Sequence, residues 1–374
     1  MTVHTTTTPP AAEVGYLGWS GRGNLGDDAL LEVIRDNLPE ARLTFPPMDV
    51  GGLVRHLAKR PAAGRSTRHL VLGGGTAVGR ANWRAAVHAS AISCGASRHL
   101  IGVGVEDPAF GGLHSFSGRG ELARWRSVLS SFSAVTVRGP RSAELLDRVG
   151  VQAEVVGDPA LLLAPSEESS DTAGLRDTRT IAVSLGFGDD LWGHDHASVV
   201  AVVIGALARL AQDGWAVRLI VMNRSDEAHA QQIAAALEGY DVLTERPTTA
   251  AEFFAAVAPC SVMLAERLHA GVLAACADLP VVMVEYQPKC RDFMRSIGAD
   301  ELTVRTDALG VRLLLDLVER AVSDESMRAG VATAVARMRG QLGEQVALLR
   351  ADVLSGSTGP SELAGQGPAE VAAR

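Results

Sequence analysis

Two short segments in the second half of the chain carry basic residues that could bind an anion. Arg267 and His269 follow the apolar run 261–264, and Lys289 follows the apolar run 281–284. Because ligands in α/β proteins bind at the carboxyl ends of strands, we expect these three side chains to meet at one sheet edge. Arginine offers bidentate contacts and histidine titrates near neutral pH, so the cluster suits a small, highly charged anion.

A glycine-rich turn near the start of the chain could serve a second ligand. Residues 21–26 fit the pattern G-x-G-x-x-G between an expected strand and an expected helix, which is the form of a dinucleotide-binding turn. Asp27 and Asp28 follow directly, and two carboxylates at a helix start would repel a pyrophosphate. A turn capped by an aspartate and a site where carboxylates accept hydrogen bonds from hydroxyl groups are the interpretations that fit these carboxylates better, and dinucleotide binding stays open beside them.

A second glycine turn, Gly73–Gly75, follows the expected strand 69–72. Successive glycines let backbone N–H groups approach a ligand closely, so Gly74 and Gly75 are candidate binding residues. A crowded turn between strands would need the same glycines.

The composition describes a globular chain of two domains. Its 374 residues are 47% hydrophobic and 21% charged, and the net charge of −8 argues against a general nucleic-acid surface. The four cysteines form no C-x-x-C pair, which predicts reduced thiols and no metal site. The start lacks the features of a signal peptide and no apolar run reaches the length of a membrane span, so we expect a cytoplasmic protein.

Strands and helices are expected to alternate along most of the chain. Strands are predicted at 13–19, 42–48, 69–72, 100–105, 134–137 and 153–156, and again at 181–185, 217–221, 241–243, 261–264 and 281–284. Helices are predicted at 27–38, 81–93, 121–132, 140–149, 197–211 and 324–349. Short apolar strands between helices indicate parallel sheets covered on both faces.

Low-complexity segments divide this alternation into two halves. We expect disordered tails at 1–12 and 351–374, a Rossmann-like domain at 13–165, a linker at 166–179, and a second Rossmann-like domain at 180–350 that ends in a long helix. The cleft between two such domains is the usual place for a ligand.

The motifs, taken in order, resemble those of the polysaccharide pyruvyl transferase family. The matching residues are Gly23-Asn24-Leu25-Gly26-Asp27, Gly73–Gly75, Val137-Arg138, Asp158-Pro159, Arg267-Leu268-His269-Ala270 and Tyr286–Lys289. One position departs from the pattern, because Gly139 stands where the family has an aspartate after the arginine.

The resemblance implies a GT-B-like fold, in which two Rossmann-like domains with parallel sheets face each other across a cleft. It also implies a transferase of polysaccharide biosynthesis that places a pyruvyl ketal on a sugar. Phosphoenolpyruvate would be the co-substrate, with no cofactor, and would bind on the side of the second domain. The acceptor, a glycan or glycosylated metabolite, would bind on the side of the first domain. A lipid-linked acceptor would bring the enzyme transiently to the inner membrane face.

Roles for individual residues follow from this chemistry. Phosphoenolpyruvate carries nearly three negative charges, which Arg138, Arg267 and Lys289 could bind. His269 is the candidate for the proton transfers, and Asp27 is a second candidate as a base. Asn24 and Asp158 are candidates for contacts with acceptor hydroxyls.

Two other functions remain open at the level of the sequence. One is a nucleotide-sugar glycosyltransferase with the same fold, which would need a carboxylate such as Glu266 or Glu285 for the ribose. The other is a non-catalytic protein that binds a glycan or a protein partner. The presence of all the basic residues argues against the non-catalytic protein, because a site that has lost its activity does not need to keep them.

Overall fold

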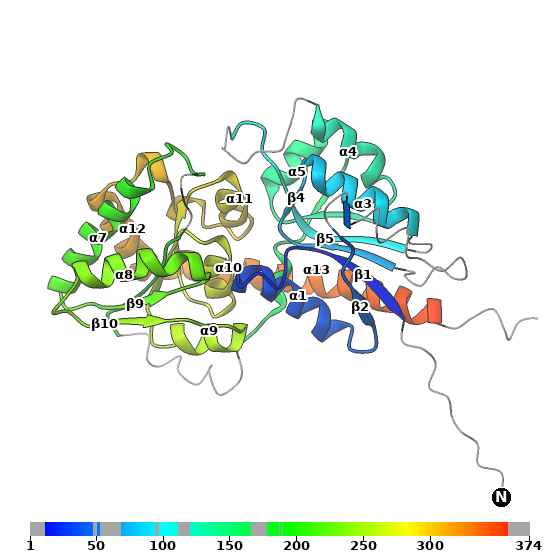
Figure 1. Ribbon diagram of the computed structural model, residues 1–374. Helices are drawn as coiled ribbons and strands as arrows, with labels where there is room; N and C mark the ends of the chain where they lie inside the picture. Colours follow the sequence, from blue (N-terminus) through cyan, green and yellow to red (C-terminus); the bar gives the residue numbers. More distant parts are fainter. Residues whose placement is uncertain are drawn as a thin grey trace, which may run out of the picture.

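The computed structural model describes residues 12–47, 51–52, 69–93, 97–110, 120–165, 178–186, 188 and 190–357. Within these residues the chain forms two parallel sheets, each in its own domain, which lie side by side (Figure 1). Most of the predicted linker, and most of both predicted tails, lie outside the described residues. The α/β class with two parallel sheets is confirmed.

The N-terminal sheet has the strand order β2-β1-β3-β5-β6-β7, and β4 pairs with β5. Its strands are β1 (Glu13–Leu17), β2 (Arg42–Thr44), β3 (His69–Gly73), β4 (Thr76–Val78), β5 (Ser97–Val105), β6 (Val135–Val137) and β7 (Glu154–Val155). Its helices are α1 (Leu25–Asn37), α3 (Ala81–Ser93), α4 (Glu121–Leu129), α5 (Pro140–Asp147) and the short helix η1 (Pro159–Leu162). Alternate residues of β1 face opposite sides, because Tyr16 packs with α1 whereas Leu17 packs with α3 and α4.

The C-terminal sheet has the order β10-β9-β8-β11-β12-β13. Its strands are β8 (Thr180–Ser184), β9 (Ala216–Ile220), β10 (Val242–Glu245), β11 (Val262–Ala265), β12 (Val281–Glu285) and β13 (Thr303–Arg305). The helices are α7 (His196–Gln212), α8 (Glu227–Ala236), α9 (Ala250–Val257), α10 (Leu268–Cys276), α11 (Pro288–Ser296) and α12 (Val311–Ser323), with the short helices η3 (Arg224–Asp226), η4 (Asp300–Leu302) and η5 (Thr306–Ala308). The central strands β8, β11 and β12 are buried along their whole length, as expected of a parallel sheet covered by helices.

The last helix, α13 (Glu325–Ser357), returns to the N-terminal domain (Figure 1). Arg339 of this helix donates hydrogen bonds to the carbonyl oxygens of Leu161 (2.7 Å) and Cys276 (3.0 Å), one in each domain. The helix continues into the segment predicted as a tail, since Val353 is buried. α13 therefore joins the two domains. Among the described residues, no helix combines the length and the apolar character needed to cross a bilayer.

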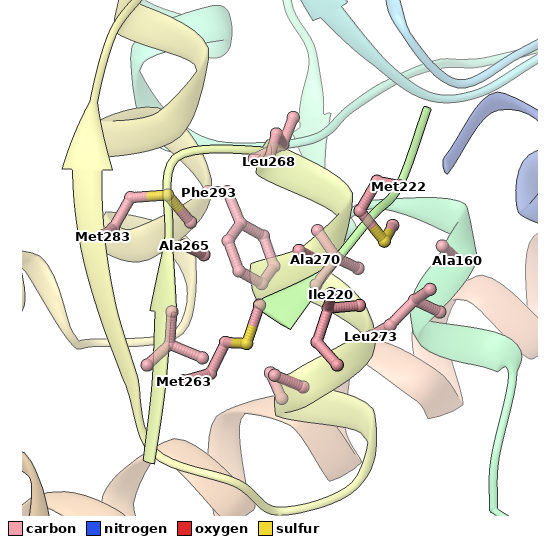
Figure 2. Close-up of a cluster of buried hydrophobic side chains, with 14 of the residues drawn as sticks. Ala160, Ile220, Met222, Met263, Ala265, Leu268, Ala270, Leu273, Met283 and Phe293 are labelled. Carbon is pink, nitrogen blue, oxygen red and sulfur yellow. The ribbon is translucent and has the colours of Figure 1, made fainter. Parts of the chain in front are cut away.

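Helix α10 lies at the centre of the molecule. Figure 2 shows Leu273 of this helix near Ala160 of the N-terminal domain, while Met263 and Phe293 pack against it from the C-terminal domain. The small residues of α10 allow this close packing, and Cys276 Sγ lies 3.4 Å from the Ala160 carbonyl oxygen. The first turn of α10, which carries His269, is thereby held at the domain boundary.

Candidate active site

A cavity of about 270 Å³ opens between the two domains. It is lined by residues of the N-terminal domain (Trp19, Asn24, Asp27, Gly75, Thr76, Arg80 and Arg138) and of the C-terminal domain (Met222, Arg267, Leu268, His269, Tyr286 and Lys289). Most of these residues lie just beyond the carboxyl ends of strands, where parallel sheets place their ligand sites. The cavity thus brings together seven of the nine residues expected from the sequence.

Arg138 is the most deeply buried cation of the cavity. It follows β6, and its side chain has no exposed surface. Nη2 lies 3.4 Å from Thr76 Oγ1, and Nη1 lies 3.8 Å from Asp158 Oδ2. Within the described part of the chain, Nε and Nη1 have no hydrogen-bond acceptor. Because buried N–H groups of a guanidinium are costly to leave unbonded, this arrangement favours an anionic ligand.

His269 faces the same carboxylate from the other domain. Its Nε2 lies 3.8 Å from Asp158 Oδ2, and neither atom makes a hydrogen bond with another described residue. Burial lowers the pKa of His269, although the carboxylates of Asp158 and Asp27 act in the opposite direction. The imidazole is therefore neutral for most of the time near pH 7, and a bound anion would favour its protonation.

Lys289 lies in the first turn of helix α11 and completes the cationic set. Its Nζ lies 4.7 Å from the centre of the Tyr286 ring. Burial, together with the positive charges of Arg80 and Arg138, lowers its pKa to about 8, although Cys290 and Asp27 act in the opposite direction. Cations from both domains thus crowd one cavity, which is the electrostatic character of an anion site.

Arg267 lines the cavity, but its guanidinium already binds a buried carboxylate. Its Nε donates to Asp226 Oδ2 (3.0 Å), and its Nη2 donates to Asp226 Oδ1. Asp226 in turn accepts a hydrogen bond from the backbone N–H of Asn223 (3.1 Å). A direct contact between Arg267 and an anion therefore stays a prediction.

The start of α1 places Asp27 opposite the basic residues. Asn24 caps the helix by accepting a hydrogen bond from the Gly26 N–H (3.2 Å), and its Nδ2 donates to Asp27 Oδ2 (2.7 Å). Burial raises the pKa of Asp27, whereas His269 and Lys289 act to lower it. Asp28 has a different task, because it accepts a hydrogen bond from the Gly21 N–H (2.7 Å) and so holds the turn.

The other predicted residues take different positions. Gly75 lines the cavity, but a Cβ at Gly74 would lie 2.5 Å from a methyl group of Leu30, so Gly74 permits the packing of α1. Asp158 is fully buried beneath the cavity and caps η1 by accepting a hydrogen bond from the Ala160 N–H (3.1 Å).

Three polar side chains of the cavity were not singled out as candidates from the sequence. Thr76 is the first residue of the short strand β4, and Arg80 follows the end of this strand, which sequence patterns do not reveal because it has three residues. Arg80 Nε donates to Glu106 Oε2 (2.7 Å), which fixes the guanidinium at the rim. Tyr286 is the first residue of the Tyr286–Lys289 motif and directly follows β12. Its place after a strand is the signal by which the sequence could have indicated it as a binding residue.

Comparison with known proteins identifies the family. Residues 24–288 match the model of the polysaccharide pyruvyl transferase family. No curated protein matches the chain.

Several solved structures share the fold. A proposed UDP-N-acetylglucosamine 2-epimerase from Listeria monocytogenes has a TM-score of 0.56 at 12% identity, with 86% of this chain and 91% of that chain covered. The UDP-GlcNAc 2-epimerase from Neisseria meningitidis has a TM-score of 0.53 at 9% identity, with 92% and 99% covered. A glycosyltransferase from Rickettsia africae has a TM-score of 0.51 at 10% identity, with 91% and 98% covered.

At these identities the structural likeness shows the fold alone, which is the GT-B architecture expected from the sequence. The family match covers more than half of the sequence and includes most residues of the cavity, from Asn24 to Tyr286. This chain belongs to the polysaccharide pyruvyl transferase family.

Proposed function

We propose that this transferase uses phosphoenolpyruvate to form a pyruvyl ketal on two hydroxyl groups of a sugar acceptor, with release of phosphate. The observation that supports this most directly is Arg138, whose buried guanidinium keeps N–H groups without an acceptor in the described part of the chain. Lys289 and His269 approach the same cavity from the other domain. A compact ligand with a carboxylate and a phosphate matches this arrangement, because each cation then gains an anionic partner.

The proton transfers can be assigned to two residues. His269, as imidazolium, donates a proton to the methylene carbon of phosphoenolpyruvate, which becomes a methyl group and leaves positive charge at C2. The first sugar hydroxyl attacks C2 and gives its proton to Asp27. Phosphate then departs with the C–O electron pair. The second hydroxyl closes the ketal ring, and its proton leaves with the phosphate.

The electrostatics of the cavity support these roles. A lowered pKa makes imidazolium a stronger acid, and a raised pKa makes carboxylate a stronger base. The negative charges of phosphoenolpyruvate would favour protonation of His269 when the substrate binds, since opposite charges stabilise the ionised form. Substrate binding would thus bring His269 into the protonated form that donates a proton, while Asp27 accepts one.

A second cavity offers a place for the acceptor. It has a volume of about 280 Å³ and lies beside the first, with Met222 lining both. Successive residues of the α1 turn face the two cavities, because Asp27 lines the first and Asp28 lines the second. Thr248 and Arg246 supply further polar groups. We place the sugar here, with its reacting hydroxyls directed past Met222 toward Asp27.

The alternative of a nucleotide-sugar enzyme lacks its expected carboxylate. Glu266 is fully buried and accepts a hydrogen bond from the Gly186 N–H (3.0 Å), and Glu285 accepts one from Arg291 Nε (2.7 Å). Both side chains therefore have internal partners and are poorly placed to hold a ribose. This weighs against the glycosyltransferase function.

The test is an incubation of the protein with phosphoenolpyruvate and a panel of glycans. We expect phosphate release together with a gain of one pyruvyl group on an acceptor, and thermal stabilisation by phosphoenolpyruvate alone. Arg138→Met should abolish both effects, whereas Arg209→Met on the exposed face of α7 should change neither. Stabilisation by UDP-sugars without any response to phosphoenolpyruvate would overturn the proposal. Binding of phosphoenolpyruvate without turnover of any glycan would favour the non-catalytic alternative.

A further inference from the structure

The start of helix α5 is capped by a side chain from the other domain. Asp292 of α11 is buried, and its Oδ1 accepts hydrogen bonds from the backbone N–H groups of Arg141 (2.8 Å) and Ser142 (3.3 Å). Its Oδ2 accepts a hydrogen bond from Ser142 Oγ (2.6 Å). These are the N–H groups that a residue at the N-cap position normally satisfies. That position is Gly139, which has no side chain to offer.

Gly139 also allows the two helices to approach closely. A Cβ at this position would lie 2.2 Å from Asp292 Oδ1 and 2.3 Å from the main-chain oxygen of the same residue. The φ of Gly139 is −153°, which any residue adopts, so the glycine is required by space and not by backbone conformation. This contact accounts for the departure from the family pattern at position 139.

The two joined elements carry cations of the active site. Arg138 immediately precedes the capped end of α5, and its backbone N–H donates to the Val103 carbonyl oxygen (3.0 Å). Lys289 lies in the first turn of α11, one turn before Asp292. Like charges repel, so the opposed positions of Arg138 and Lys289 need an attachment between the elements that bear them.

We propose that Asp292 is a positioning residue, whose carboxylate attaches α11 to α5 and thereby holds Arg138 and Lys289 facing each other in the cavity. The identity of the anion rests on the proposed function, but the attachment itself does not. Other contacts between the helices are weaker. Arg295 Nη2 and Glu144 Oε1 lie 3.1 Å apart at a partly exposed site, where an ion pair contributes little.

The two lysines of the chain allow a direct test. Reductive methylation with ¹³C-labelled formaldehyde gives one NMR signal for Lys289, one for Lys59, which lies outside the described residues, and one for the N-terminal amine. Lys59→Arg and Lys289→Arg assign the two lysine signals, and the third signal is then that of the terminal amine. The groups that act on Lys289 are Cys290, Arg80, Arg138 and Asp27, with the Tyr286 ring beside it. A wider separation of the helices would expose Lys289 to water and would move Arg138 away from it. Both changes raise the pKa of Lys289 from about 8.

Three variants distinguish attachment from simple capping. Asp292→Ala should raise the pKa of Lys289 toward the ordinary lysine value and weaken phosphoenolpyruvate binding by roughly tenfold. Asp292→Asn keeps an acceptor for the backbone N–H groups. Its Lys289 pKa and its phosphoenolpyruvate affinity should therefore lie between those of the wild-type protein and those of Asp292→Ala. Gly139→Asp combined with Asp292→Ala supplies the cap from within the N-terminal domain, but its Cβ meets the main chain of α11. The new cap and the crowding at position 139 act in opposite directions on thermal stability, and the double variant should recover neither property of the cavity.

Arg295→Ala on the same helix is the matched control and should leave the Lys289 titration and the binding unchanged. The proposal is overturned if Asp292→Ala leaves the Lys289 pKa at its wild-type value. It is also overturned if the double variant restores both the pKa and the affinity, because Asp292 would then only cap α5. If the wild-type protein does not bind phosphoenolpyruvate, the proposed function fails, and the Lys289 titration still decides the role of Asp292.

Discussion

Gly26 and His269 are in contact across the domain boundary. A Cβ at Gly26 would lie 2.3 Å from Nδ1 of His269 and 2.5 Å from the Cβ of the same histidine. The first turn of α1 therefore meets the first turn of α10 without an intervening side chain. The last glycine of the first glycine turn is explained by this contact with a proposed catalytic residue, and not by a bound dinucleotide.

The first prediction concerns this contact. Gly26→Ala should displace His269 or separate the domains, because there is no free space for the added methyl group. We expect a loss of turnover of at least tenfold and a stability cost of about 1–3 kcal/mol, as for other overpacked sites. Gly330→Ala is the control, since nothing lies within 4 Å of a Cβ there and the residue is inside helix α13. Steady-state kinetics and urea unfolding measure both effects, and full activity in Gly26→Ala would contradict the role given to the contact.

The second prediction concerns the protonation of Lys289. Phosphoenolpyruvate should bind the ammonium form, so its affinity should fall as the pH rises through about 8. Lys289 should account for about half a proton of the uptake on binding at pH 8, because half of the free protein is then deprotonated at this residue, and protonation of His269 adds its own share. Calorimetry in buffers of different ionisation enthalpy measures the uptake.

Lys289→Arg is the matched variant for this experiment. It keeps the positive charge but does not titrate in this range, so binding should persist and the uptake should fall by about half a proton, which leaves the share of His269. An unchanged uptake would show that another group takes the proton.

The third prediction is the consequence for the stability of the free protein. The pKa of Lys289 is about 8 in the folded chain and 10.5 in its ordinary state, so between these values the unfolded chain binds more protons. The free energy of unfolding should therefore rise with pH in this window, by at most about 1.4 kcal/mol per pH unit from this residue. Lys289→Met should lack this part of the rise. The comparison with the variant is needed because the buried Tyr16, whose pKa is raised, and Cys260, Cys276 and Cys290, whose pKa values are raised to about 12, act in the opposite direction in both proteins at the upper end of this window. Identical slopes in the two proteins between pH 8 and 10 would contradict the assignment.

The sequence predicts the parts of this site that follow from local rules. β11 and β12 are neighbouring parallel strands, so the basic residues that follow them had to meet at one edge. The motif order then placed Arg138 and Asp27 on the facing domain. Each of these inferences needs only strand direction and the position of a residue after a strand.

The parts that the sequence does not predict depend on contacts between distant segments. The partner of Arg267 is Asp226, in a short helix that has no periodic pattern. The cap of α5 comes from Asp292, far along the chain, and only packing of the finished domains brings it to Gly139. Gly74 and Gly75 look equivalent in the sequence, yet one faces Leu30 and the other faces the cavity. Tertiary packing decides which member of such a pair meets a ligand.

The last prediction tests His269 as the proton donor. His269→Gln keeps a neutral polar side chain of similar size, and burial already disfavours the charged imidazole, so the fold should be retained. Turnover should fall by about 10²–10⁴-fold, which is the usual contribution of a general acid, while phosphoenolpyruvate binding should change far less. In deuterated water the wild-type enzyme should place one deuterium in the methyl group of the ketal, and the variant should form the labelled product only at its reduced rate. His88→Gln on the exposed face of α3 is the control and should behave as the wild type. Normal turnover in His269→Gln would assign the proton to another group, and Lys289 would then be the first to test, because its lowered pKa and its place in the same cavity allow it to donate near neutral pH.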